Sequence, residues 1–292
     1  MPKKDLVTQD NALINASYTL ELVEKRLILL AIARSRKSGK GITANDHLGI
    51  YASDYADSFN VESSASYKAL KSAAETLFNR YFVYDVEDKK GNVGTAKSRW
   101  VSEINYFNDE GYLRLIFAPS VVPFITDLEK KFTSYFLDDV SALTSAYAIR
   151  LYELIIAWRS TGKTPVFELA ELRAKLGVAE NEYQRMFNFK QRVLDVAVNQ
   201  INEHTNIRIK VEQHKRGRAI SGFSFSFKEM STEHERDPNT IDWIDEAIGN
   251  IKKKQKQKIT VQQAEKMARA GESWDDLKSR LSPDYIIMFK NG

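Results

Sequence analysis

A run of polar side chains between residues 183 and 204 is of the type that reads DNA bases. At about 100° per residue, a helix over this segment separates apolar from polar residues. Its apolar side holds Phe189, Val193, Leu194, Ala197 and Ile201. Its polar side holds Gln191, Arg192, Asp195, Asn199 and Asn202. Because amide and guanidinium groups match the donors and acceptors of base edges in a major groove, the polar side is a candidate reading surface.

A predicted β-hairpin with a basic tip follows this helix. Apolar and polar residues alternate over residues 207–211 and again over 220–227. The basic turn between these runs consists of His214, Lys215, Arg216, Gly217 and Arg218. A helix followed by a hairpin whose tip lies on phosphates is the layout of a winged helix. The alternative is a solvated helix face beside an ordinary basic turn, and the adjacency of the two features favours DNA binding.

The composition is that of a globular protein without cysteine. The chain has 292 residues, 43% of them hydrophobic and 28% charged, which is enough for about two domains. The lack of cysteine fits a reducing cytosol and excludes disulfides and thiolate metal sites. No apolar run approaches the ~20 residues of a membrane span, so we expect a soluble, cytoplasmic protein with no membrane partner. The net charge is only +4, but residues 119–228 carry 16 basic against 12 acidic side chains, the local excess that phosphate binding requires.

The amino-terminal half predicts a winged helix of its own. After a flexible lead-in over residues 1–17, we expect a strong helix over 20–35 in which Glu21 and Lys25 pair at i,i+4. The later elements are a strand over 47–51, helices over 53–59 and 63–80, and strands over 81–86, 97–107 and 112–118. Ser63 or Ser64 is the candidate N-cap of the helix over 63–80. The predicted inner face of that helix holds Tyr67, Leu70, Ala74 and Leu77.

The same order of elements recurs after residue 118. We expect a linking helix over 121–130, a strand over 132–137, a helix over 145–159 with Trp158 inward, a short strand over 164–167 and a helix over 168–176 that Gly177 ends. The predicted fold class is α+β, with two tandem winged-helix domains and a flexible C-terminal tail. The predicted domains are residues 11–118 and 119–228. Residues 229–292 are expected to form a linker and tail, with a lysine-rich stretch over 252–258 and short helices over 241–251 and 260–281.

Motifs that would indicate an enzyme are absent from the sequence. Gly162, Lys163 and Thr164 resemble the end of a phosphate-binding loop, but Ala157 occupies the position of its first glycine and a helix precedes the segment. The four histidines have no metal-ligand spacing, so no metal and no metal-dependent nickase is predicted. We therefore expect neither a catalytic set nor a cofactor.

Several segments resemble a known family. In the second half they are YELIIAWRSTGKTPVFELAELRAKLGV, FKQRVLDVAVNQINEHT and KRGRAISGFSFSF. In the first half, where the match is looser, they are VEKRLILLAIAR, SSASYKALKSAAETLFNRYF and SRWVSEINYF. Over residues 11–228 the chain resembles the twin winged-helix plasmid replication initiators, the iteron-binding Rep family of theta-replicating bacterial plasmids.

The resemblance implies a non-enzymatic initiator. Members of that family bind direct repeats, called iterons, in double-stranded DNA at the plasmid origin as monomers, help to open an AT-rich element and recruit the host replication initiator and helicase. As a homodimer in equilibrium with the monomer, they bind an inverted-repeat operator and repress their own gene. The first domain usually carries the dimer interface and backbone contacts, and the second supplies most of the base readout.

The resemblance also implies DNA-binding residues in both domains. In the second domain Gln191, Arg192, Asn199 and Asn202 would face base edges, with Arg185 and Lys190 near phosphates at the helix start. Lys215, Arg216 and Arg218 would hold the backbone from the hairpin. In the first domain Ser64, Ser66, Lys68 and Lys71 would occupy the equivalent helix start, with Arg99 on the hairpin. Asp195 departs from this pattern, because it repels phosphate unless it accepts a hydrogen bond from a cytosine amine.

Two other functions are left open by the sequence. A dimeric winged-helix repressor without an initiation role has the same DNA-binding features, and a DNA-nicking or primer-making enzyme is less favoured because no metal cluster is predicted. We also expect dimerisation to bury apolar surface near residues 101–107 and 112–117, including Ile104 and Leu115.

Overall fold

The computed structural model describes residues 5–37, 42–126, 132–230, 257–260 and 285–288 of the chain. The chain divides into two compact units, one that ends at residue 232 and one over residues 233–292. None of the helices in the described segments has both the length and the apolar character that a membrane span requires.

The first winged helix is built on α2 (Leu22–Lys37), which is flanked by α3 (Ala52–Phe59) and by α4 (Ser63–Thr76) with its 3₁₀ extension η1 (Leu77–Asn79). Every residue of α2 from 24 to 33 is buried, so its core face is wider than an amphipathic stripe. The predicted inner face of α4 is half correct. Leu70 and Leu77 are buried, but Tyr67 is 43% exposed. Ser66 and Ala73 take the positions that were expected for Tyr67 and Ala74, so the helix is rotated by about one residue.

Two three-stranded sheets complete this domain. One has the order β2 (Ser17–Tyr18), β4 (Tyr81–Glu87), β5 (Val93–Arg99); the other has the order β3 (Leu48–Tyr51), β7 (Tyr112–Phe117), β6 (Val101–Phe107). The single strand predicted over residues 97–107 is therefore wrong, because the chain changes sheet at Trp100. The indole of Trp100 is fully buried, with ring centroids 4.9 Å from Tyr18 and 5.0 Å from Phe82. This packing fixes the point where the chain turns.

The expected flexible lead-in is an ordered strand and helix. β1 (Leu6–Asp10) pairs antiparallel with β8 (Phe132–Phe136) in the register Leu6 to Phe136 and Asp10 to Phe132, and α1 (Asn11–Asn15) follows. α5 (Val122–Thr126) packs against β1. The strand was missed because Thr8 and Gln9 suggest solvent, whereas both are buried. The pairing joins segments on either side of the predicted division after residue 118, which itself stays a prediction.

After β8 the chain forms α6 (Asp138–Ser141) and α7 (Ala146–Ile156). α7 is buried over residues 148–156, and Trp158, predicted inward, is 38% exposed because it lies beyond the helix end. β9 (Phe167–Glu168) leads into α8 (Leu169–Lys175). Gly177 ends this helix as predicted, with φ +78°; a Cβ there would lie 2.6 Å from the Tyr18 carbonyl oxygen, so only glycine fits.

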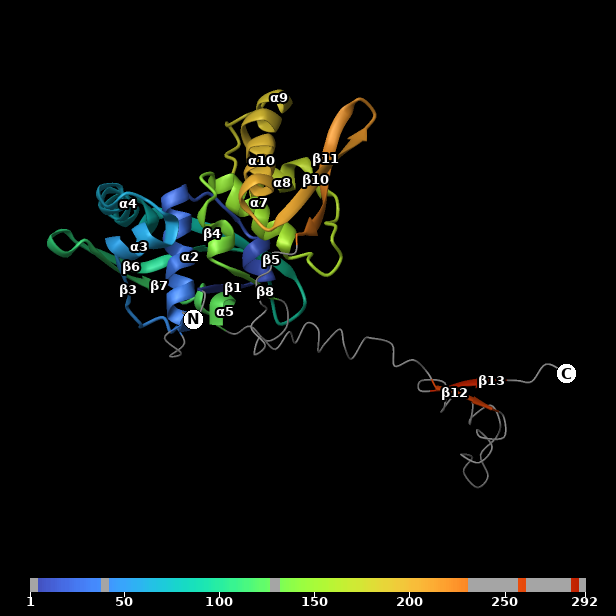
Figure 1. Ribbon diagram of the computed structural model, residues 1–292, viewed down its shortest axis with the longest axis horizontal. Helices are drawn as coiled ribbons and strands as arrows, with labels where there is room; N and C mark the ends of the chain where they lie inside the picture. The colour runs from blue at the N-terminus through green and yellow to red at the C-terminus, as the bar shows by residue number, and fades with distance from the viewer. Residues whose placement is uncertain (1–4, 38–41, 127–131, 231–256, 261–284, 289–292) are drawn as a thin grey trace, which may run out of the picture. The chain divides into compact units, whose positions relative to one another are not determined.

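The remaining elements of this domain are the polar helix and the hairpin. The helix consists of α9 (Met186–Phe189), a π turn η3 (Lys190–Leu194) and α10 (Asp195–His204). The hairpin consists of β10 (Ile207–Arg216) and β11 (Ala219–Glu229), and β9 pairs with the outer edge of β11. Figure 1 shows α9 and the tip of the hairpin at the same end of the domain.

A buried ionic network joins α2 to α7. Lys25 Nζ lies 2.8 Å from Glu153 Oε1, and Arg150 donates to Glu153 Oε2 at 3.0 Å; all three side chains are at most 3% exposed. The predicted pair of Glu21 with Lys25 is therefore wrong, and Glu21 pairs with Arg80 instead. Burial by itself would raise the pKa of Glu153, but Lys25 and Arg150 lower it to about 2, so the carboxylate stays ionised.

In the carboxy-terminal unit the structure describes two strands. β12 (Gln257–Thr260) pairs in parallel with β13 (Tyr285–Met288). The predicted helix over 241–251 lies outside the described residues. So do the predicted helices over 260–281 apart from Thr260, and the lysine-rich stretch over 252–258 apart from its last two residues.

Candidate nucleic-acid interface

The buried side of the polar helix is as predicted. Its members are Phe189, Val193, Leu194, Ala197 and Ile201, none of them more than 2% exposed. Phe189, Val193, Ala197 and Ile201 follow one another at a spacing of four residues. In an uninterrupted α-helix that spacing would drift around the axis, because an α-turn holds about 3.6 residues. The π turn takes about one extra residue and so keeps all four side chains on the core.

The π turn also changes which polar residues face outward. Gln191, Arg192 and Asn199 are exposed as predicted, and so is Asp195. Asn202 is not part of this surface. Its amide donates to the Ile209 carbonyl at 3.3 Å and accepts from the Ile209 N–H at 2.6 Å, so it fastens the helix to β10. The expectation that Asn202 faces bases is a phase error, because residues after the π turn are rotated relative to a regular helix.

Lys190 is half-buried and its ammonium donates to Gln213 Oε1 on β10 at 3.2 Å. It therefore connects the helix to the hairpin in this structure. Arg185 is exposed at the N-terminal end of α9. Among the described residues, Arg192 has no hydrogen bond or ion pair, and the same holds for Gln191 and Asn199. Their donors and acceptors are thus available to a ligand.

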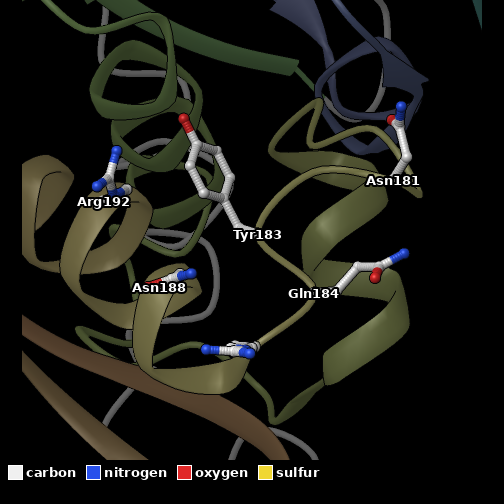
Figure 2. A pocket seen from close by; sticks show the side chains of 6 residues that line it. Asn181, Tyr183, Gln184, Asn188 and Arg192 are labelled. Atoms are coloured by element: carbon white, nitrogen blue, oxygen red, sulfur yellow. The ribbon is translucent and has the colours of Figure 1, made fainter.

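A shallow polar cavity of about 380 Å³ lies at the start of this helix. The residues lining it are Asn181, Tyr183, Gln184, Arg185, Asn188 and Arg192. Figure 2 shows Arg192 and Asn188 on one wall, with Gln184 and Asn181 on the other. Sequence reasoning found only the two arginines. The helical periodicity did not include the loop before residue 185. The polar residues Asn181, Tyr183 and Gln184 of that loop are nevertheless a sequence signal for a polar binding surface.

Arg173 of α8 shapes the loop that carries this cavity. Its guanidinium donates to the backbone carbonyls of Tyr183 at 3.0 Å and Ala179 at 3.5 Å. Tyr183 adopts the left-handed region with φ +42°, which is uncommon for a residue other than glycine. These bonds hold the loop that carries Asn181 and Gln184.

The hairpin tip carries three exposed cations, as predicted. Arg216 is 84% exposed and lies 3.8 Å from Glu168, a weak contact at this distance. Lys215 and Arg218 are exposed, and neither has a polar partner among the described residues. Gly217 turns the chain with φ +64°, and the strand register shifts between His214 and Lys215. A bulge of this kind re-aims the side chains beyond it.

A polar cluster below the tip was not anticipated. His214 Nε2 lies 2.8 Å from Ser224 Oγ, and Glu212 pairs with Lys163 at 3.2 Å. The hydrogen bond and charge of Lys163 lower the pKa of Glu212. These residues occupy one face of the hairpin, where Glu212 offsets part of the basic charge.

In the first domain the equivalent helix start is only partly accessible. Lys68 and Lys71 are exposed, and the Ser64 hydroxyl is exposed and bonds Glu62 at 3.1 Å. Ser66 is fully buried and its hydroxyl donates to the Ser63 carbonyl at 2.7 Å, so its predicted DNA contact is wrong for this conformation. The N-cap is Glu62 and makes no side-chain cap bond, so neither serine caps the helix.

Arg99 is exposed but held by the protein. Its guanidinium lies over the Phe78 ring, 4.9 Å from the centroid, and donates to the Phe78 carbonyl and to Asn79 Oδ1. Lys97 on the same strand lies 3.4 Å from the centroid of the Tyr81 ring. Arg99 and Lys97 are therefore engaged by aromatic neighbours.

The expected dimer residues differ in exposure. Leu115 is fully buried in the core, so its predicted place on a dimer surface is wrong; Ile104 is partly buried. A charge at Leu115 would unfold the domain whatever its oligomeric state. As to metal sites, the described segments contain no cluster of three or more histidine, aspartate or glutamate side chains that could hold an ion.

The fold and this surface define the class, a protein with two winged helices and an exposed polar reading helix beside a basic hairpin. Residues 6–156 match the family model for Initiator Replication protein, WH1, and residues 168–227 match that for Initiator Rep protein, WH2. The chain belongs to this family of replication initiator proteins.

Individual known proteins are also similar to this chain. A replication initiation protein of Escherichia coli is 26% identical over 226 residues, which cover 75% of this chain and 68% of the relative. The PI protein of Escherichia coli is 28% identical over 254 residues, which cover 77% of this chain and 83% of the relative. The crystal structure of Pi initiator protein in complex with iteron DNA has a similar fold, with a TM-score of 0.63 at 24% identity over 80% of this chain and 100% of that one. The chain is thus a replication initiator protein by family and by fold.

Proposed function

We propose that the protein initiates plasmid replication in the cytoplasm by binding direct repeats in double-stranded origin DNA, without catalysing a reaction itself. The observation that carries this proposal is the set of unpaired polar side chains on α9, η3 and α10 beside the cations of the β10–β11 tip. Arg192, Gln191 and Asn199 would read base edges, while Arg185, Lys215 and Arg218 would bind phosphates. The relative solved with iteron DNA supports the choice of ligand.

We also propose that the two domains have different roles in DNA binding. The second domain, residues 119–228, reads the repeat. The first, residues 11–118, contacts the DNA backbone through Ser64, Lys68 and Lys71 and carries the interface of a homodimer in equilibrium with the monomer. The dimer binds an operator inverted repeat, and the monomer recruits the host replication initiator and helicase. Two winged helices in one chain span about two successive major-groove faces, roughly one helical turn apart.

The test is a mobility shift with origin-repeat DNA against scrambled DNA at two salt concentrations. Arg192→Ala should lose most of the preference for the repeat and keep salt-sensitive binding to both DNAs. Arg208→Ala, at the base of β10 and away from the tip, is the matched control with the same change in charge. Equal affinity of the wild-type protein for repeat and scrambled DNA would refute the proposal.

Two further assays separate the alternatives. A plasmid that carries only this gene and the adjacent repeats should replicate, and failure to replicate despite specific binding would favour a repressor without an initiation role. Supercoiled origin DNA incubated with the protein and Mg²⁺ should remain uncut. Nicking that a purified wild-type protein produces and a denatured sample does not would overturn the non-enzymatic part of the proposal.

A further inference from the structure

An apolar side chain lies exposed in the first turn of the reading helix. Phe187 is 71% exposed, whereas Phe189 two residues later is fully buried. Within the described part of the chain, Phe187 is not among the residues that pack against the core. The phenyl ring of Phe187 therefore lies largely in water in the first turn of this helix.

Phe187 continues the polar stripe of the helix. Phe187, Gln191, Asp195 and Asn199 follow one another at four-residue spacing, and all four are exposed. The π turn between residues 190 and 194 keeps this spacing aligned, as it does for the buried side. The N-terminal residues of a recognition helix are the ones that contact base edges in a major groove. Phe187 thus occupies a reading position.

The surroundings of Phe187 favour DNA over an apolar protein partner. Arg185, Asn188 and Arg192 line the polar cavity at the same helix start. Such a cationic rim complements phosphates. A phenyl ring offers no donor or acceptor, and the one apolar group that a base presents in the major groove is the C5 methyl of thymine.

We propose that Phe187 is a specificity residue that reads thymine by packing its ring against the C5 methyl group. The contact would add an apolar determinant to the polar readout by Gln191 and Arg192. It distinguishes thymine from cytosine, which lacks the methyl group. This inference rests on the proposed function, since it requires that α9 enters the major groove of the repeat.

The experiment removes the methyl group and the ring in turn. Each thymine of the bound repeat is replaced singly by deoxyuridine, which deletes only the methyl group, and wild type and Phe187→Ala are titrated on every duplex. Wild type should lose about fourfold in affinity at one or two thymines, the factor that burial of one methyl group is worth. Phe187→Ala should bind the unmodified repeat more weakly by at least that factor and should no longer respond to deoxyuridine at the same positions.

This design separates the inference from the function on which it rests. Failure of wild type to prefer the repeat over scrambled DNA would refute the proposed function. Preference for the repeat with the same deoxyuridine losses in wild type and Phe187→Ala would refute only the role of Phe187. Phe187→Leu, which keeps an apolar contact, should retain part of the response. If Phe187→Ala binds DNA like wild type but no longer supports plasmid replication, the ring faces a protein and the inference is overturned.

Discussion

The two winged helices present their helix starts and hairpins differently. In the second, Arg192 and Gln191 project from the reading helix without a partner among the described residues, and Lys215 and Arg218 are equally free at the hairpin tip. In the first, Arg99 and Lys97 lie over the rings of Phe78 and Tyr81. Cations that are already engaged give up a contact before they bind phosphate. Arg99 and Lys97 therefore differ from the cations at the tip of the second hairpin, and we expect them to contribute less to phosphate binding.

The largest expected effect concerns the buried network of Lys25, Arg150 and Glu153 between α2 and α7. Glu153→Gln should lower the free energy of unfolding by about 3–5 kcal/mol, because Lys25 and Arg150 would be left as buried charges without their carboxylate. Urea unfolding followed by circular dichroism measures this. Glu229→Gln breaks the exposed pair with Arg159 and should cost about 0–1 kcal/mol. A loss no greater than that of the control would mean that the stability of the fold does not depend on the network.

The same carboxylate sets a pH dependence. The pKa of Glu153 is about 2 in the folded protein, below the value of 4.5 for a free glutamate, so the unfolded state binds its proton first as the pH falls. The stabilisation that Glu153 provides is complete above pH 4.5 and is lost as the pH falls from 4.5 towards 2. The stability difference between wild type and Glu153→Gln should therefore shrink over that range. A constant difference would contradict the assignment.

The next effect tests the comparison at the two helices. Arg192→Ala should weaken binding to the repeat by about 5- to 150-fold while non-specific binding changes little, because a bidentate base contact is worth about 1–3 kcal/mol. Lys68→Ala, on the corresponding helix of the first domain, should weaken binding to repeat and scrambled DNA alike. Fluorescence anisotropy with both duplexes gives the ratio of the affinities for repeat and scrambled DNA directly. If Lys68→Ala changes the ratio as much as Arg192→Ala does, both domains read bases.

A pair of asparagines on one helix separates reading from structure. Asn199→Ala should lower the preference for the repeat and leave the melting temperature unchanged. Asn202→Ala should lower the free energy of unfolding by about 1–3 kcal/mol, because it leaves the N–H and carbonyl of Ile209 unpaired. Thermal unfolding and anisotropy on both variants provide the measurement. If Asn199→Ala lowers the stability and Asn202→Ala lowers the preference for the repeat, the π turn does not determine which residues of α10 face outward.

Local patterns predicted most of the elements and much of the reading surface. The alternation in β10 and β11 and the apolar side of the reading helix follow from nearest-neighbour spacing, which a sequence shows directly. The pairing of β1 with β8 joins residues more than a hundred positions apart, and polar Thr8 and Gln9 gave no sign of burial. Local pattern contains no information on such distant partners.

The errors at the site have two physical causes. A helical wheel assumes a constant turn angle, so the π turn misplaced Asn202, and a rotation of about one residue in α4 misplaced Ser66. The sequence prediction also assumed that a charged side chain is either exposed to water or paired with an opposite charge on the same helix. Lys25 instead pairs with Glu153 in the core, because tertiary packing brings the two side chains together. The cavity residues Asn181 and Gln184 were missed because loops have no period to read.

The smallest expected effect distinguishes the two hairpins by their salt dependence. Each phosphate contact contributes about 0.9 to the slope of log affinity against log salt, so Lys215→Ala should reduce that slope by about 0.9 and weaken binding only a few-fold at moderate salt. Lys97→Ala removes an equal charge from the first hairpin, but this ammonium lies on the Tyr81 ring. Its loss should change the slope by less. Equal reductions would show that the ring contact yields to phosphate when DNA binds, and the two hairpins would then hold DNA in the same way.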